Sequence, residues 1–193
     1  MAKEATRNKI LEVGSRIIHQ KGFNNTGIQE ILNEAGVPKG SFYFYFKSKE
    51  DFGLALIDEF DSLVGGHLAS ILEIDSLSPL ERLKSFFSFF KNFFQEENCT
   101  KGCPIGNLSQ ELSDVNENIR KRLDESFNSL ASLIETCLYE ARERGEFQND
   151  IPVPEIAAYI INSWEGALLR MKVSRDIKPL LVFERILFGT ILK

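Results

Sequence analysis

Several residue types that carry chemistry are scarce in this 193-residue chain, which holds three cysteines, two histidines and one tryptophan. An odd cysteine count argues against a disulfide framework, and a zinc site would need four ligands at recognisable spacing. Only Cys137, His19 and His67 accompany the pair Cys99 and Cys103, and all three are isolated. We therefore expect reduced thiols, no bound metal and no cofactor.

Long uncharged apolar runs are also missing. No stretch approaches the roughly 18–20 residues that a membrane-spanning helix needs, and even FFSFFKNFF is interrupted by Lys91. The first residues, MAKEATRNK, are charged and lack the apolar segment of a secretory signal. These absences predict a cytoplasmic protein that does not span a membrane.

Enzyme motifs are lacking as well. Neither histidine accompanies a nucleophile or paired carboxylates in a recognisable motif, and no glycine-rich phosphate loop occurs. We therefore expect no catalytic residues. A helical enzyme and a helical binding module stay open as alternatives from composition alone.

Apolar residues at three- and four-residue steps fill most of the chain, and 43% of all residues are hydrophobic. Capping and helix-breaking residues predict a first helix that ends at residue 22 and four more at 26–35, 38–46, 48–72 and 79–97. A short sixth helix begins near 104, and the seventh ends at 145. The last two span 154–174 and run from 179 onward. No alternating pattern typical of strands occurs. The sequence predicts an all-α protein of about nine helices.

The first three helices predict a helix-turn-helix DNA-binding domain. Two short helices joined by a tight turn at Gly36 follow a longer helix, and such a unit places its second short helix in the major groove. Residues 1–53 carry eight basic and six acidic side chains, whereas the remainder carries 15 and 22. We assign residues 4–64 to this domain, with the recognition motif at about 27–46.

The candidate DNA contacts lie on the second short helix and at helix starts, where backbone N–H groups favour anions. Lysine neutralises phosphate or reaches guanine, hydroxyls bond phosphate or base, and an aromatic ring contacts a thymine methyl. Gly40 allows close backbone approach. The predicted contacts are Thr26, Pro38, Lys39, Gly40, Ser41, Tyr43, Phe44, Lys47 and Lys49.

The string GFNNTGIQEILNEAGVPKGSFYFYFKSKEDF resembles the DNA-binding region of the TetR family of bacterial repressors. The match includes Gly22-Phe23, Ala35-Gly36-Val37, Lys39-Gly40 and Lys49-Glu50. The chain departs from many members at Phe44, where they carry histidine, and this change would alter which bases are read.

The resemblance implies a homodimeric transcriptional repressor that binds double-stranded DNA at a palindromic operator, with residues 65–193 forming an effector-binding and dimerisation domain. The last two helices carry more apolar surface than the outer helices of a monomer should. In the family, such helices form a four-helix bundle between subunits; the alternative is an internal core. The predicted interface residues are Leu168, Met171, Phe183, Ile186 and Leu187.

Six phenylalanines occur between residues 86 and 94, too many for one helix face. Some of them must therefore line a neighbouring helix, a pocket or an interface. By resemblance this helix borders a small-molecule cavity, and we name Phe86, Phe90 and Phe93, with Trp164, as candidate effector contacts. The alternative is that these rings belong to the core alone.

Cys103 precedes Pro104, which we expect at the first position of a helix. A thiol at a helix N-terminus, with Lys101 nearby, would favour its thiolate form. Alternatively, Cys103 is only a small residue at a tight helix entry. Cys137 falls on an apolar stripe and is expected to be an inert core thiol.

The stretches KGCPIGNLSQELSDVNENIR and WEGALLRMKVSRDIKPL resemble electrophile- and oxidant-sensing members of the TetR family. In those members a cysteine after a glycine is the sensor and a lysine is its partner, which here are Cys103 and Lys172. Related members sense noncovalent ligands, so an aromatic or apolar effector with a structural Cys103 is the alternative.

Overall fold

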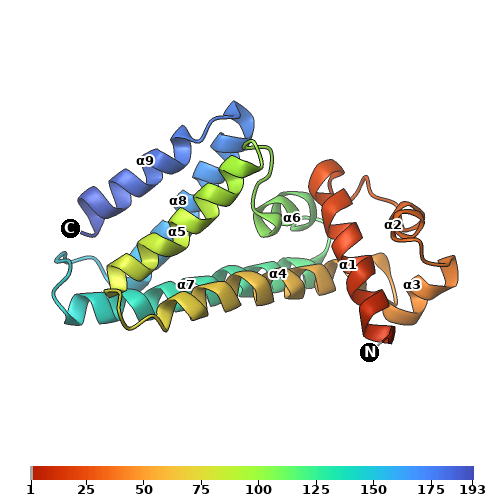
Figure 1. Cartoon of the computed structure of the whole chain (residues 1–193), viewed down its shortest axis with the longest axis horizontal. Coiled ribbons are helices and arrows are strands. Elements are labelled where there is room, and N and C mark those ends of the chain that lie inside the picture. The colour runs from red at the N-terminus through yellow and green to blue at the C-terminus, as the bar shows by residue number, and fades with distance from the viewer. Residues whose placement is uncertain (1) are drawn as a thin grey trace. The chain divides into compact units, whose positions relative to one another are not determined.

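The computed structural model describes residues 2–193, and every regular element in that range is helical (Figure 1). The elements are α1 (Ala2–Lys21), α2 (Ile28–Ala35), α3 (Lys39–Tyr45), α4 (Lys49–Leu72), α5 (Pro79–Glu96), α6 (Pro104–Leu112), α7 (Glu117–Glu143), α8 (Val153–Ser174), α9 (Lys178–Ile186) and the π-helical segment Leu187–Ile191. The all-α prediction is confirmed. Over the same residues, no helix combines the length and apolarity needed to cross a membrane.

Glycine ends two helices as the sequence predicts, and proline and serine lie at the N-caps of two others. Gly22 and Gly36 follow α1 and α2 with φ of 86° and 64°, a left-handed conformation that glycine adopts without strain. Pro38 caps α3. Ser78 and Glu81 form a reciprocal capping box at the start of α5.

Two helices begin later than the predicted residues 26 and 48. Helix α2 begins at Ile28 with Gly27 as its N-cap, because the hydroxyl of buried Thr26 instead donates to the carbonyl of Gly22 at 2.8 Å. Before α4, which begins at Lys49, the Ser48 hydroxyl accepts the N–H of Asp51 at 3.0 Å. The Asp51 carboxylate, however, accepts the N–H of Lys47, one residue earlier than a capping box requires.

The chain forms two compact units. The first comprises the residues up to Asp61 together with Pro104–Asp124, and the second comprises Ser62–Cys103 and Glu125–Lys193. The domain boundary predicted at residue 64 lies close to residue 61, where the chain first passes from one unit to the other. That prediction, however, assigned α6 and the start of α7 to the second domain. In the structure these helices pack within the first unit.

Aromatic packing holds α3 in the first unit. Phe42 is fully buried, and its ring centroid lies 5.3 Å from that of Phe46 and 5.7 Å from that of Phe52. Helix α1 packs on α2, and α2 on α3. The long helix α1 and the short helices α2 and α3 thereby pack in series.

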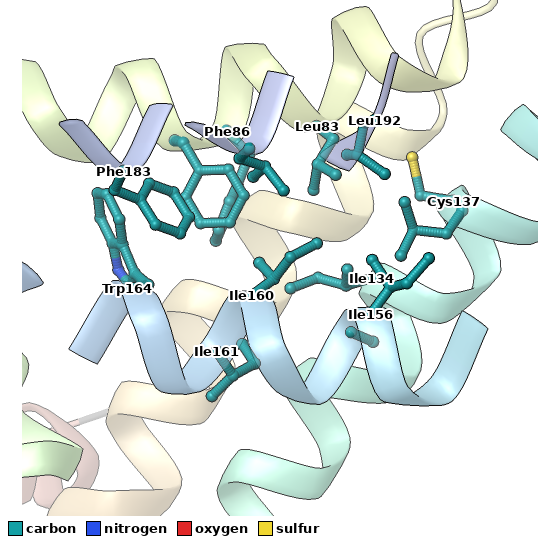
Figure 2. Close-up of a cluster of buried hydrophobic side chains, with 14 of the residues drawn as sticks. Leu83, Phe86, Ile134, Cys137, Ile156, Ile160, Ile161, Trp164, Phe183 and Leu192 are labelled. Atoms are coloured by element: carbon teal, nitrogen blue, oxygen red, sulfur yellow. The ribbon is translucent and has the colours of Figure 1, made fainter. Parts of the chain in front are cut away.

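The core of the second unit joins α5, α7, α8 and α9 (Figure 2). Phe87, Trp164 and Phe183 come from three of these helices, and their ring centroids are 5.0–5.1 Å apart. Buried Arg82 donates to the Ile74 carbonyl and to Glu140, each at 2.9 Å. The guanidinium is therefore partnered where it enters the core.

Two glycines within helices differ in the space around them: Gly14 of the first unit is closely packed, and Gly66 is not. A Cβ at Gly14 in α1 would overlap the ring of Phe52 and lie 3.3 Å from Ile31, whereas a Cβ at Gly66 in α4 would meet nothing within 4 Å. We expect Gly14→Ala to lower the free energy of unfolding by about 1–3 kcal/mol through overpacking. Gly66→Ala should raise it by about 0.5–1 kcal/mol. Urea denaturation at one protein concentration measures both, and stabilisation by Gly14→Ala would show that the ring of Phe52 moves freely.

Candidate nucleic-acid interface and sensor site

One face of α3 is open to solvent. Lys39 and Gly40 are exposed at its start, and Tyr43 and Phe44 are 61% and 62% exposed although both are aromatic. A Cβ at Gly40 would meet no atom within 4 Å. The Lys3 ammonium lies 4.2 Å from the centre of the Phe44 ring. The exposed face therefore combines a cation, a hydroxyl and apolar rings within two helical turns.

Of the other predicted contacts, Pro38 and Lys47 are exposed and Ser41 is half-buried. Thr26 has no exposed surface, and its hydroxyl is bonded within the α1–α2 loop. Thr26 therefore fixes the loop from inside and does not present its side chain to a ligand.

Lys49 is also directed inward. Its ammonium donates to the backbone carbonyl of Phe23 at 2.6 Å and lies 4.7 Å from the centre of the Phe23 ring. Burial lowers the pKa of Lys49, and the carboxylate of Glu111 opposes this effect. Lys49 thus ties the start of α4 to the loop before α2, a role different from the predicted phosphate contact.

Glu111 of α6, which the sequence did not single out, completes this tie. Its carboxylate accepts the backbone N–H of Asn24 at 3.1 Å and lies against Gly22 in the same loop. Helix α6 therefore contacts the loop that leads into the helix-turn-helix. No sequence signal distinguishes this acid from the other exposed acids, since its partner lies 87 residues away.

Side chains at the start of α7 form hydrogen bonds and ion pairs with α4 within the first unit. Arg122 donates to Asp58 at 2.8 Å and to Asp61 at 2.5 Å, and the Asn118 amide donates to Glu50 at 2.9 Å. These polar contacts, with those of Glu111, explain why residues 104–124 belong to the same unit as α1, α2 and α3.

The candidate aromatic contacts divide between core and surface. Phe86 is buried and packs edge-on against half-buried Phe90, with centroids 5.1 Å apart. Phe93 is 39% exposed, beneath the Lys101 ammonium. Trp164 lies in the core cluster with Phe87 and Phe183. The four candidates therefore do not form one lining.

His67 of α4 is a further group near the phenylalanines. Its ring is tilted by 40° against that of Phe89, with centroids 4.0 Å apart, and contacts the ring of Phe90 edge-on at 5.9 Å. Its Nε2 atom is buried and has no hydrogen-bond partner among the described residues. A buried polar atom beside three aromatic rings can accept or donate one further hydrogen bond.

Cys103 is half-buried against the core of the second unit, directly before the first residue of α6. Its thiol forms a hydrogen bond with the carboxyl group of Glu165 on α8. Burial raises the pKa of Glu165 to about 7, and the bond to Cys103 acts in the opposite direction. Glu165 was missed in the sequence, although it lies seven residues before Lys172 on the same side of α8.

The lysines named beside Cys103 have different surroundings. Lys101 pairs with Glu97 at 2.9 Å, and Lys172 is half-buried on α8. Glu165 adds an acid to the surroundings of Cys103 that the sequence analysis did not name.

The loop before Cys103 has an unusual backbone. Asn98 and Cys99 both adopt positive φ, 53° and 55°, and the Cys99 carbonyl accepts a 3.5 Å hydrogen bond from Arg175. Cys99 is buried, and burial, with Asp176 adding to it, raises the pKa of its thiol. Cys137 is also buried, its thiol donates to the Pro79 carbonyl at 3.0 Å, and burial raises its pKa to about 12. Both thiols are therefore poor nucleophiles.

Comparison with known proteins identifies this architecture. Residues 79–187 match the family model "Tetracyclin repressor-like, C-terminal domain", and residues 10–56 match "Bacterial regulatory proteins, tetR family". The chain belongs to the TetR family. The TetR-family match confirms the resemblance found in the sequence, and proteins of this family are DNA-binding transcriptional regulators that form dimers, not enzymes.

Similar TetR-family proteins span nearly the whole chain. The HTH-type transcriptional repressor DhaR of Mycobacterium sp. (strain GP1) is 34% identical over all of this chain and 95% of its own length. The HTH-type transcriptional repressor NemR of Escherichia coli (strain K12) is 31% identical over 91% of this chain and 88% of its own. The crystal structure of reduced E. coli NemR superposes with a TM-score of 0.86 over 93% of each chain.

The residues predicted at a TetR-type dimer interface lie mostly in the interior of one chain. Leu168, Met171, Phe183 and Leu187 are buried in the core of the second unit, which leaves them no surface for a partner; only Ile186 is exposed, at 40%. This placement corresponds to the internal-core alternative. The large apolar residues that α8 and α9 do expose are Tyr159, Leu169, Val173, Leu181, Val182 and Ile186.

The two lysines near the start of α4 should behave differently on substitution. Lys49→Ala removes a charge-assisted hydrogen bond to the Phe23 carbonyl, which keeps only its bond from the Thr26 N–H at 3.2 Å, so we expect a loss of about 1.5–3 kcal/mol in the free energy of unfolding. Lys47→Ala removes an exposed side chain and should change stability by less than about 0.5 kcal/mol. Chemical denaturation of both variants measures the difference, and equal stabilities would refute the internal role of Lys49.

Proposed function

We propose that this TetR-family regulator is a cytoplasmic repressor that binds a palindromic operator as a homodimer and is released when an electrophile or oxidant modifies Cys103. The observation that carries the DNA-binding part is the open face of α3, where Lys39, Tyr43 and Phe44 are exposed beside buried Phe42. Two such faces one helical turn of DNA apart, about 34–36 Å, would read a two-fold site.

The position of Cys103 in the chain supports a sensing role. It is the last residue before α6, a helix that belongs to the DNA-reading unit. The Glu111 carboxylate of α6 accepts a hydrogen bond from the Asn24 N–H in the loop between α1 and α2. Arg122 of α7 donates a hydrogen bond to Asp58 of α4. A group added to Cys103 would displace the start of α6 and disturb these contacts. A coupling of about 1–3 kcal/mol is enough to change operator affinity 5- to 150-fold.

A second candidate effector is an aromatic or apolar ligand that binds noncovalently. The observation that favours it is His67, whose buried Nε2 has no hydrogen-bond partner within residues 2–193 and whose ring lies among Phe86, Phe89 and Phe90. A ligand that carries one hydrogen-bonding group on an aromatic body would suit these surroundings.

The reading face can be tested by two substitutions. We expect Lys39→Ala and Tyr43→Ala each to weaken binding to an inverted-repeat oligonucleotide from the flanking DNA by about 1–3 kcal/mol, because each removes a base or phosphate contact. Fluorescence anisotropy at fixed salt measures the affinity, and light scattering verifies the dimer. Lys84→Ala, an exposed lysine of the second unit, is the charge-matched control. Loss of the dimer, or unchanged affinity, would rule out this assignment.

The sensor can be tested with N-ethylmaleimide and with hypochlorite, which oxidises a thiol to a sulfenic acid and is itself reduced to chloride. Cys103→Ser should bind the operator normally but should no longer be released by either reagent. Cys99→Ser and Cys137→Ser keep Cys103 and should be released like the parent protein. If Cys103→Ser is still released, the covalent proposal fails and the noncovalent effector is favoured.

A further inference from the structure

The beginning of α1 contacts the end of α3 through two cations. Lys3 and Arg7 are four residues apart and therefore lie on the same face of α1. The Lys3 ammonium lies 4.2 Å from the centre of the Phe44 ring, and the Arg7 guanidinium lies 5.4 Å from the centre of the Phe46 ring. All four residues belong to the first unit. This face of α1 therefore adjoins the helix that carries the proposed DNA-reading residues.

Arg7 joins α1 to the core beneath α3. Phe46 is buried, and its ring centroid lies 5.3 Å from that of Phe42 and 5.1 Å from that of Phe52. A half-buried guanidinium over such a ring holds the first turns of α1 against α3. Lys3, one helical turn earlier, is therefore carried to Phe44 by a helix that is itself anchored.

The Phe44 ring is contacted from two sides and still faces solvent. The Tyr45 ring meets it edge-on, with centroids 5.0 Å apart and an interplanar angle of 88°, and the Lys3 ammonium lies over one of its faces. With both neighbours in place, Phe44 is 62% exposed. The ring is thus supported from its own helix and from α1, while most of its surface is available to a ligand.

Support of this kind matters for an exposed aromatic side chain. Ordering a mobile side chain on binding costs free energy, and a contact that already orders it in the unbound protein reduces that cost. A cation over the ring face is attracted by the ring quadrupole and provides such a contact. The group of a DNA base that suits an apolar ring is the C5-methyl of thymine in the major groove.

We propose that Lys3 positions the Phe44 ring for contact with a thymine methyl group, so that the two residues together set the preference of each subunit for one thymine. This role rests on the proposed binding of an operator through α3, and it adds a residue outside the helix-turn-helix to those that determine sequence preference. A lysine that contacted phosphate would act differently. It would be indifferent to the base and would contribute to the salt dependence of binding.

The experiment uses an inverted-repeat duplex from the flanking DNA in which thymines are replaced, one symmetric pair at a time, by deoxyuracil, which lacks only the C5-methyl group. Fluorescence anisotropy with the full-length protein measures Kd at several salt concentrations. For the parent, replacement of one symmetric pair should weaken binding roughly 10- to 20-fold, because each of two buried methyl groups contributes a factor of about four. Phe44→Ala should lose this preference for thymine.

The variants at Lys3 separate the two roles. Lys3→Met keeps an unbranched side chain without its charge, and it should reduce the preference for thymine by about 2- to 4-fold per subunit. Lys3→Arg keeps a cation over the ring and should retain the preference. Lys9→Met is the matched control, because Lys9 is an exposed lysine of α1 six residues further on, on a different side of the helix, and it should behave like the parent.

Several results would overturn the proposal. If the parent binds thymine and deoxyuracil duplexes equally, Phe44 reads no methyl group. If Lys3→Met keeps the full preference for thymine, Lys3 does not position the ring. A preference that stays intact while the slope of log Kd against log salt falls by about 0.9 per subunit would identify Lys3 as a phosphate contact. If the parent binds none of the duplexes, operator binding fails and the role of Lys3 with it, whereas the other results leave operator binding intact.

Discussion

A seven-residue helix does not persist alone in water, so α3 depends on the burial of Phe42 against Phe46 and Phe52. The same burial decides which side of α3 faces solvent. With Phe42 inside, its neighbour Tyr43 and the next residue, Phe44, must lie outside on so short a helix. The exposure of two aromatic rings, costly in a monomer, follows from the anchoring of a third.

Polar contacts extend this anchoring beyond the three-helix head. Thr26 and Lys49 stabilise the α1–α2 loop from inside, and Glu111 reaches the same loop from α6. Arg122 joins α7 to α4 through two aspartates. The orientation of the reading helix is therefore linked to residues more than 60 positions later in the chain. All of these contacts lie within the first unit.

The parts of the fold that the sequence predicts are those set by neighbours along the chain. Gly36 ends α2 as predicted, and Pro38 lies at the start of α3, although as its N-cap and not as its first residue. Thr26 was misread as a cap because its competing acceptor, the Gly22 carbonyl, satisfies the hydroxyl equally well within four residues. Local patterns cannot decide between two such nearby partners.

Contacts between residues far apart in the chain could not be predicted from the sequence, for a different reason. An apolar stripe shows that Leu168 and Phe183 are covered, but it is identical whether the cover comes from the same chain or from a partner. Likewise, nothing local singles out Glu111 from exposed acids or pairs Glu165 with a cysteine 62 residues earlier in the chain. Family resemblance supplied Cys103, yet the acid beside it emerged only from three-dimensional packing.

The division of the chain has a consequence for how the protein can be dissected. The backbone passes between the two units three times, twice inside the continuous helices α4 and α7 and once at the bond between Cys103 and Pro104. A fragment ending near residue 61 would lose Glu111, Asn118 and Arg122 and leave their acidic and amide partners bare. The DNA-reading half is therefore not a detachable module, and domain exchange with a relative would have to carry residues 104–124 along with the N-terminal helices.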